Sequence, residues 1–461
     1  MKKTLIAVAW CAALLGMPAA ASAASYIVIG AKGAKLDQAV ANAGGRITKR
    51  LAAVDAVVAE SDSANFQSRV AASSGVQAVL PNISIRWKPR DERGPEAIAE
   101  VLNPPNAVNI DSRFNLQWGH DAVNAPEAWD SGQIGSGARV AVLDGGFSLN
   151  HPDFAGQVDP TCTADMTGEG IAYGPNPDDP TGIFSHGNHT AGTIAAGRNG
   201  FGTIGVAYGA KLCLIKVLFN IGSGSFDDIV EGIIFAADHD VDIINMSLGG
   251  SLVKSGEAGL YTASEAAEFK NFVNRAVTYA NQKGVLVIAS AGNDANNGDQ
   301  DKNLIHLPSD TPHAMSVSAT APIGWGVNPT VFLDNPASYT NYGRSVISVA
   351  APGGDFQYFF VNPGQVCVVA GVIQLCYVFD YVFSMGGVVG NSAFYYWSAG
   401  TSMAAPHVAG VAALLVGKHG KMKPAQLRSL LERGADDLGQ PGNDPFYGAG
   451  RVNAMKSLGL R

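Results

Sequence analysis

From about Phe114 onward, short apolar runs alternate with longer stretches of helical periodicity. Apolar runs without polar alternation are typical of strands that are buried on both faces of a parallel sheet. Such runs predict strands at residues 139–143, 212–217, 241–246, 285–289 and 346–349. The alternation with helices predicts an α/β domain, in which a mostly parallel sheet carries helices on both faces.

One of the intervening helices can be placed from its residues. Ser225 can accept a hydrogen bond as an N-cap, and the next thirteen residues, 226–238, repeat apolar side chains on one face. These are Ile229, Val230, Ile233, Ile234 and Ala237. We expect this face to cover the sheet.

The residues before position 88 follow a different pattern of apolar and polar positions. Apolar segments at 26–29, near Ile47, at 56–58 and at 78–80, with helical stretches after the first and third, predict a small α+β domain of order β-α-β-β-α-β. Residues 89–111 mix charges with four prolines and have no sustained period, which is typical of an exposed linker that invites cleavage. The expected units are 24–88, the linker 89–111, and the main domain 112–461.

The first 23 residues have the composition of a secretory signal peptide. Lys2 and Lys3 precede an apolar run, and small residues close the segment at Ala23. A membrane anchor is the alternative, but the run is shorter than the roughly 20 apolar residues that span a bilayer. The protein is therefore expected to be secreted, either extracellular or periplasmic. Residues 366–383 are also apolar, but Gly371, Gln374 and Asp380 favour a hairpin over a second span.

Four cysteines remain after the leader, so an exported chain can form two disulfides. Three connectivities are possible. Closeness in sequence favours Cys367 with Cys376, which leaves Cys162 for Cys213. The absence of a C-x-x-C pair makes a metal site the less favoured use.

Composition excludes some classes of function. The 461 residues are 47% hydrophobic and 15% charged, enough for a large core. The net charge of −8 gives no basic surface for nucleic acid.

Three segments place a reactive side chain close to glycine. Asp144 lies in V-A-V-L-D-G-G, His186 begins H-G-N-H-T-A-G, and Ser402 lies in G-T-S-M-A-A-P-H. Alone, each residue could be a turn or helix-cap residue. A carboxylate, a base and a hydroxyl together make an acyl-transfer set.

The order Asp144, His186, Ser402, with Asn293 of A-G-N between the last two, resembles the subtilase family of serine proteases. The resemblance runs from about Trp118 to Ala454. It implies a subtilisin-like fold with Asp144 orienting the base His186, Ser402 as nucleophile and Asn293 in the oxyanion hole. It also implies protein or peptide substrates, no catalytic cofactor, a monomer, and a precursor whose residues 24–88 are an inhibitory propeptide.

The same resemblance assigns binding residues. Two glycine-rich segments would pair with the substrate main chain, and part of a third would line the specificity pocket: Gly222, Ser223, Gly224; Ser247, Leu248, Gly249; and Ala291, Gly292. Asp153 and Asn199 resemble ligands of a structural calcium site, although Phe114 stands near the family's N-terminal glutamine ligand.

Two other functions compete with this interpretation. An α/β-hydrolase esterase needs G-x-S-x-G and the order Ser, Asp, His, neither of which is present. A non-enzymatic binding or chaperone module predicts the loss of a reactive residue, whereas all three are present. Residues 251–272 and 355–396 are longer than in compact subtilases and are expected to lie near the cleft.

Overall fold

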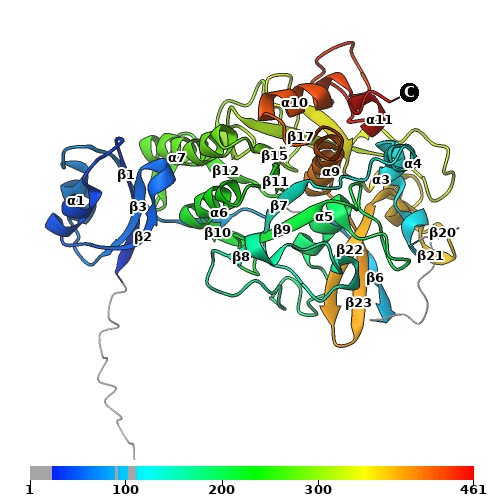
Figure 1. Ribbon diagram of the computed structural model, residues 1–461, viewed down its shortest axis with the longest axis horizontal. Helices are drawn as coiled ribbons and strands as arrows, with labels where there is room; N and C mark the ends of the chain where they lie inside the picture. The colour runs from blue at the N-terminus through cyan, green and yellow to red at the C-terminus, as the bar shows by residue number, and fades with distance from the viewer. Residues whose placement is uncertain (1–22, 89–91, 102–110, 461) are drawn as a thin grey trace, which may run out of the picture.

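The structure, a computed structural model, describes residues 23–88, 92–101 and 111–460. It contains a small N-terminal domain beside a larger α/β domain (Figure 1). The predicted signal peptide lies outside the described residues except for Ala23, and residues 89–91 and 102–110 of the predicted linker also lie outside them.

The large domain is built on an eight-stranded sheet of order β18-β17-β15-β11-β7-β9-β8, with β19 also paired to β17. Only β18 pairs antiparallel, so the prediction of a mostly parallel sheet is confirmed. The strands are β7 (Arg139–Asp144), β8 (Ala164–Asp165), β9 (Lys211–Lys216), β11 (Ile243–Met246), β15 (Leu286–Ser290), β17 (Ala314–Ala321), β18 (Asn335–Pro336) and β19 (Val349–Pro352).

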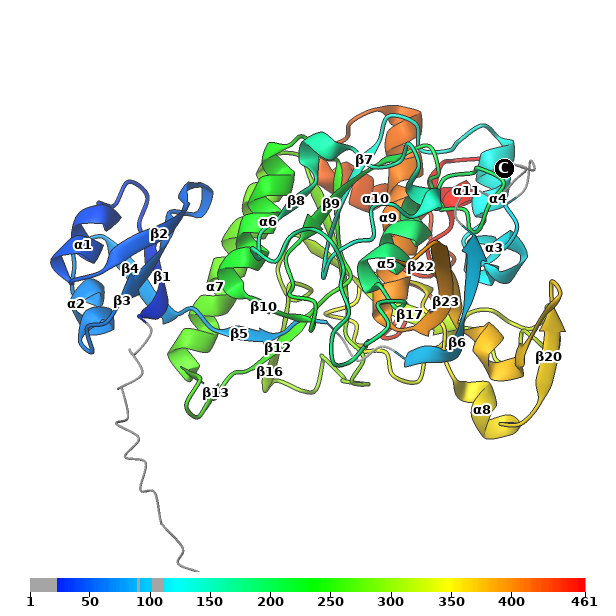
Figure 2. The same cartoon turned by 90° about the horizontal axis from the view of Figure 1, so that it is seen from below.

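Alternate residues of β7 show why its sequence is apolar throughout. Val140 and Val142 belong to the core beneath α5 (His186–Ala195) and α9 (Thr401–His419). Ala141 and Leu143 belong to the core beneath α6 (Phe226–Asp238) and α7 (Ala263–Gln282). Figure 2 shows these two helix pairs on opposite sides of the sheet. The predicted helix 226–238 has the expected bounds, and Ser225 caps it by accepting from the Asp228 N–H.

Shorter elements surround this core. The remaining helices of the large domain are α3 (Trp118–Ala122), α4 (Ala125–Asp130), α8 (Gln357–Val361), α10 (Pro424–Arg433) and α11 (Ala454–Ser457). The strands β12 (Gly250–Val253) and β16 (Leu304–Leu307) pair antiparallel, as do β13 (Gly256–Glu257) and β14 (Tyr261–Thr262).

The N-terminal domain has the predicted β-α-β-β-α-β order. Its antiparallel sheet has the order β2-β3-β1-β4, and its two helices pack on one face with a core of their own. The elements are β1 (Ala24–Gly30), α1 (Leu36–Asn42), β2 (Arg46–Leu51), β3 (Ala56–Ser61), α2 (Phe66–Ala71) and β4 (Val76–Pro81). The domain lies beside α6 and α7 in both views (Figures 1 and 2).

The described part of the predicted linker is not irregular. Residues Glu92–Val101 form β6, which pairs with β23 (Ser392–Ala399), and β23 pairs with β22 (Val382–Val389). The expectation of a segment without regular structure is wrong here. The partner strand lies about three hundred positions further along the chain, so no local sequence pattern predicts the pairing.

Both favoured disulfides are present, Cys162–Cys213 and Cys367–Cys376. The second closes the hairpin of β20 (Val366–Val369) and β21 (Val372–Leu375), which confirms the predicted hairpin. Among the described residues, no helix combines the length and apolarity needed to cross a bilayer.

Candidate active site

Asp144 and His186 form a buried pair at the carboxyl end of the sheet. Asp144 is the last residue of β7, and its two carboxylate oxygens lie 2.9 and 2.8 Å from Nδ1 of His186. The Gly145 N–H donates to the same carboxylate over 2.7 Å. A carboxylate on Nδ1 fixes the imidazole tautomer, so that Nε2 can act as a base.

Two helix starts carry the other reactive groups. Ser185 caps α5 by accepting from the Asn188 N–H, which makes His186 the first residue of that helix. Ser402 is the second residue of the nineteen-residue helix α9, where the helix dipole favours negative charge. The two helices pack against each other.

The Asn293 side chain is held one residue from Ser402. Its Oδ1 accepts from the Thr401 N–H over 2.9 Å and from the Thr401 hydroxyl over 2.7 Å. That hydroxyl in turn accepts from the Gly292 N–H. Since Oδ1 takes both bonds, the amide nitrogen of Asn293 is turned away from Thr401, and it can donate to a negative oxygen beside Ser402.

The predicted binding segments follow neighbouring strands. Ser247 comes directly after β11, and Ala291 comes directly after β15, which pairs with β11. The Ser247 hydroxyl donates to the carbonyl of Ser402 over 2.7 Å. Carboxyl ends of adjacent parallel strands meet at one edge of a sheet, and this edge therefore gathers residues that are far apart in sequence.

The end of the N-terminal domain lies between the two glycine-rich segments. Strand β5 (Ser84–Arg86) pairs antiparallel with β10 (Ser223–Ser225). The next residue, Trp87, donates its N–H to the Gly222 carbonyl over 3.1 Å and accepts from the Gly249 N–H over 2.7 Å. The predicted substrate segments thus bind an extended stretch of this chain itself.

Trp87 is the buried anchor of this contact, which sequence reasoning missed. It is fully buried, its indole N–H donates to the Gly224 carbonyl over 3.0 Å, and its ring meets Phe226 edge to face. A lone tryptophan immediately before a charged, proline-rich segment was the available signal.

A cation also joins the two domains. Lys49 of β2 lies 2.7 Å from Asp227, 2.8 Å from Asp228 and 2.7 Å from Glu231, all on α6. Burial opposes the charge of Lys49, but the attraction of Asp227 and the three hydrogen bonds raise its pKa well above the ordinary lysine value. Lys49 is therefore a permanent cation over the whole physiological range of pH.

Comparison with known proteins identifies the family. Residues 135–450 match the model of the subtilase family of peptidases. The chain belongs to the subtilase family. This subtilase is 32% identical to thermitase of Thermoactinomyces vulgaris over 355 residues, covering 77% of this chain and 99% of thermitase. It is also 32% identical to subtilisin E of Bacillus subtilis over 368 residues, covering 78% of this chain and 77% of that protein. It is accordingly a subtilisin-like serine endopeptidase.

Solved structures agree on the fold. The epidermin leader peptide processing serine protease of Staphylococcus aureus superposes with a TM-score of 0.72 at 18% identity, covering 95% of this subtilase and 98% of that chain. Fervidolysin of Fervidobacterium pennivorans, a keratinolytic enzyme, has a TM-score of 0.68 at 24% identity, covering 97% and 62%.

Asp153 and Asn199, the calcium ligands expected from the family resemblance, are both held by hydrogen bonds in this subtilase. Asp153 accepts from the N–H and the hydroxyl of Thr203 through one oxygen and from the Tyr395 hydroxyl, 3.2 Å away, through the other. Asn199 accepts from the Phe201 N–H and donates to the Pro152 carbonyl. Within the described residues, no group of three acidic, histidine or cysteine side chains could hold a metal.

These hydrogen bonds argue against the calcium expectation, which stays a prediction. An ionised carboxylate offers about four acceptor sites, and three of those of Asp153 are taken. Burial raises the pKa of Asp153 well above its ordinary value, although the hydrogen bonds from Thr203 and Tyr395 lower it. One of these partners, Tyr395, comes from β23, a strand that the sequence pattern did not predict.

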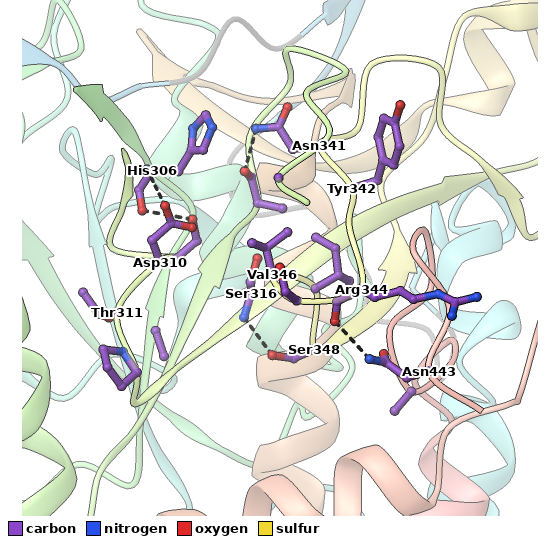
Figure 3. A pocket seen from close by; sticks show the side chains of 18 of the residues that line it. His306, Asp310, Thr311, Ser316, Asn341, Tyr342, Arg344, Val346, Ser348 and Asn443 are labelled. Atoms are coloured by element: carbon purple, nitrogen blue, oxygen red, sulfur yellow. Dashed lines mark hydrogen bonds between the residues drawn. The ribbon is translucent and has the colours of Figure 1, made fainter. Parts of the chain in front are cut away.

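A cavity of about 820 Å³ adjoins the site at Ala291 (Figure 3). Leu304 and His306 of β16 line it. Its lining also includes Arg428 and Glu432 of α10 but none of Asp144, His186, Asn293 and Ser402, so it is not the catalytic cleft itself. Most side chains labelled in Figure 3 are polar, and they include Asn341, which donates to the Ala291 carbonyl over 2.9 Å.

Proposed function

We propose that this subtilase hydrolyses peptide bonds through an acyl-enzyme, with Ser402 as nucleophile, His186 as general base and Asp144 as the residue that orients it. The observation that carries the proposal is the buried contact of both Asp144 carboxylate oxygens with Nδ1 of His186. It leaves Nε2 as the nitrogen that can take a proton.

Each step then follows from these groups. Oγ of Ser402 attacks the carbonyl carbon of the substrate while its proton passes to Nε2 of His186. The Asn293 amide and the Ser402 N–H donate to the oxyanion. His186 returns the proton to the leaving amine as the C–N bond breaks. Water then hydrolyses the ester by the same route, and Ser402 regains its proton. No step requires a catalytic cofactor.

The protein is further proposed to be a secreted, self-processing zymogen whose mature form is a monomer. The position of β5 and Trp87 between Gly222 and Gly249 supports an inhibitory role for residues 24–88, because these residues occupy the segments that would otherwise pair with substrate. A signal peptide at residues 1–23 would carry the precursor out of the cytoplasm. Mature enzyme would act on protein or peptide substrates.

The test compares intact masses and peptidase activity of the exported wild type, Ser402→Ala and a control, Ser309→Ala, whose hydroxyl lines the cavity. Ser402→Ala should retain residues 24–88 and lose activity by a factor on the order of 10⁶, the size measured for the nucleophile of subtilisin. Ser309→Ala should mature normally. Normal maturation of Ser402→Ala would assign processing to another protease, and an uncleaved, inactive wild type would favour the binding module.

A further inference from the structure

The precursor chain makes a second strand pairing beyond its contact with β10. β6 is the edge strand of the sheet β22-β23-β6 and runs antiparallel to β23. The register begins with Glu92 opposite Ala399 and ends with Val101 opposite Ser392, with one irregularity near Tyr396. Seven of the ten residues of β6 are therefore paired with β23, in two runs, 92–93 and 97–101, on either side of the irregularity.

The two pairings use different elements of the large domain. Before Lys88 the chain pairs with β10, and from Glu92 it pairs with β23. Ala399, opposite Glu92, is three residues before Ser402 and belongs to the strand that leads into α9. Since Lys88 and Glu92 are four residues apart, their Cα atoms lie within about 14 Å of each other. The chain is thus paired with β10 before residues 89–91 and with β23 after them.

The two strands of this pairing differ in how firmly they belong to the fold. In β23, Ala393 and the residues from Tyr395 to Ala399 are buried. In the part of β6 whose side chains are described, Ile98 packs partly against the core and Ala99 is exposed. Glu100 makes an ion pair with Arg113. β23 is therefore a buried strand of the fold, while the described side chains of β6 add the partial packing of Ile98 and the Glu100 ion pair to its main-chain pairing.

We propose that the outer edge of β23 binds the main chain of the substrate on the carboxyl side of the cleaved bond, and that β6 occupies this edge in the precursor as a stand-in for substrate. The proposal rests on the peptidase function proposed above. Antiparallel addition of a strand reads the peptide main chain, which all sequences share. The favoured substrates are then extended polypeptides that continue about eight residues or more past the cleaved bond, rather than short peptides.

The test uses mature wild-type enzyme and peptides with one fixed amino-side sequence. The part after the cleaved bond is lengthened from one to four to eight residues, and alternate amide nitrogens are methylated in the longest peptide. Each hydrogen bond contributes modestly, so kcat/KM should rise roughly 10- to 100-fold from the shortest to the longest peptide. Methylation should lower it at every second position, because only alternate N–H groups of an added strand face its partner.

A control separates this edge from the catalytic groups. A free peptide of residues 92–101 should inhibit cleavage of the eight-residue extension but not of an anilide substrate, which has no residues after the cleaved bond. Two results would overturn the proposal: a kcat/KM that does not depend on peptide length, or losses on methylation that do not recur at every second position. A mature enzyme in which β6 stays on β23 would show no dependence on peptide length. Failure to cleave any peptide, the anilide included, would instead contradict the peptidase function itself.

Discussion

The contact between the N-terminal domain and the large domain differs from the interior of either in what it adds to an apolar layer. Within the large domain, apolar layers lie on both faces of the sheet. Between the domains, apolar residues of the small sheet, among them Ile27, Leu51 and Leu80, join the core beneath α6 and α7. Trp87, the Lys49 ion cluster and the main-chain pairing of β5 add discrete interactions to this layer.

The added interactions make the contact specific. Continuous apolar layers stabilise a fold, because removing any part of them exposes apolar area to water. The contact between the domains combines such a layer with Trp87 and the Lys49 cluster, and a few residues of this kind carry much of the energy of an interface. The N-terminal domain also has a core of its own around Val28, Val40 and Phe66. Single substitutions at Trp87 or Lys49 should therefore weaken docking without unfolding either domain.

The largest effect should come from Trp87→Ala. Truncation of a fully buried tryptophan removes apolar contact with Phe226 and the hydrogen bond to Gly224, at a cost of about 3 kcal/mol. The inhibition constant of residues 24–88, added to mature enzyme, should rise on the order of 100-fold. Arg86→Ala, at the exposed neighbouring position, is the control and should change it little. Equal effects of both substitutions would contradict the view of Trp87 as anchor.

A smaller effect is expected from Lys49→Ala. Loss of the cation leaves Asp227, Asp228 and Glu231 close together without their partner, at a cost of about 2 kcal/mol, or roughly 30-fold in the inhibition constant. Arg50→Ala is the matched control, because Arg50 is next in the same strand but pairs with Asp37 inside its own domain.

The pH dependence of the Lys49 effect has a definite sign. The raised pKa of Lys49 means that its contribution is fully present below about 10.4, the ordinary lysine value, and is lost only as the pH rises above that value through the raised pKa. Despite burial, Lys49 keeps the pKa of Asp227 below its ordinary value, so this contact is lost only at strongly acid pH. The ratio of wild-type to Lys49→Ala inhibition constants should therefore be constant from pH 6 to 9. A steep change in that interval would assign docking to other groups.

Sequence reasoning located the parts of the fold that local patterns encode. The buried strands β7, β9, β11 and β15 were expected within about two residues of their observed bounds, because each is a continuous apolar run. Asp144, His186 and Asn293 were found from their motifs, and the structure places Asp144 against His186 and Asn293 beside the residue before Ser402.

What the sequence could not supply depends on pairs that are distant along the chain. β6 looked like a linker because its composition is charged and its partner β23 lies far away in sequence. β17 consists largely of alanine and serine and is buried throughout, so it lacks the β-branched run that marks its neighbours. The hydrogen-bond partners of Asp153 could not be predicted for the same reason, since Tyr395 reaches Asp153 only through tertiary folding.

The smallest predicted effect tests the interior side of the comparison, at Asp153. Tyr395→Phe removes one of three hydrogen bonds to a buried carboxyl and should lower the free energy of unfolding by about 1 kcal/mol. Tyr342→Phe, whose partly exposed ring stacks on Phe446, is the control. Because hydrogen bonds already occupy both oxygens of Asp153, a chelator should leave the Tm of mature enzyme unchanged, and added calcium should not raise it. A chelator-induced fall in Tm that calcium reverses would mean that an ion, rather than Tyr395 and Thr203, stabilises this region.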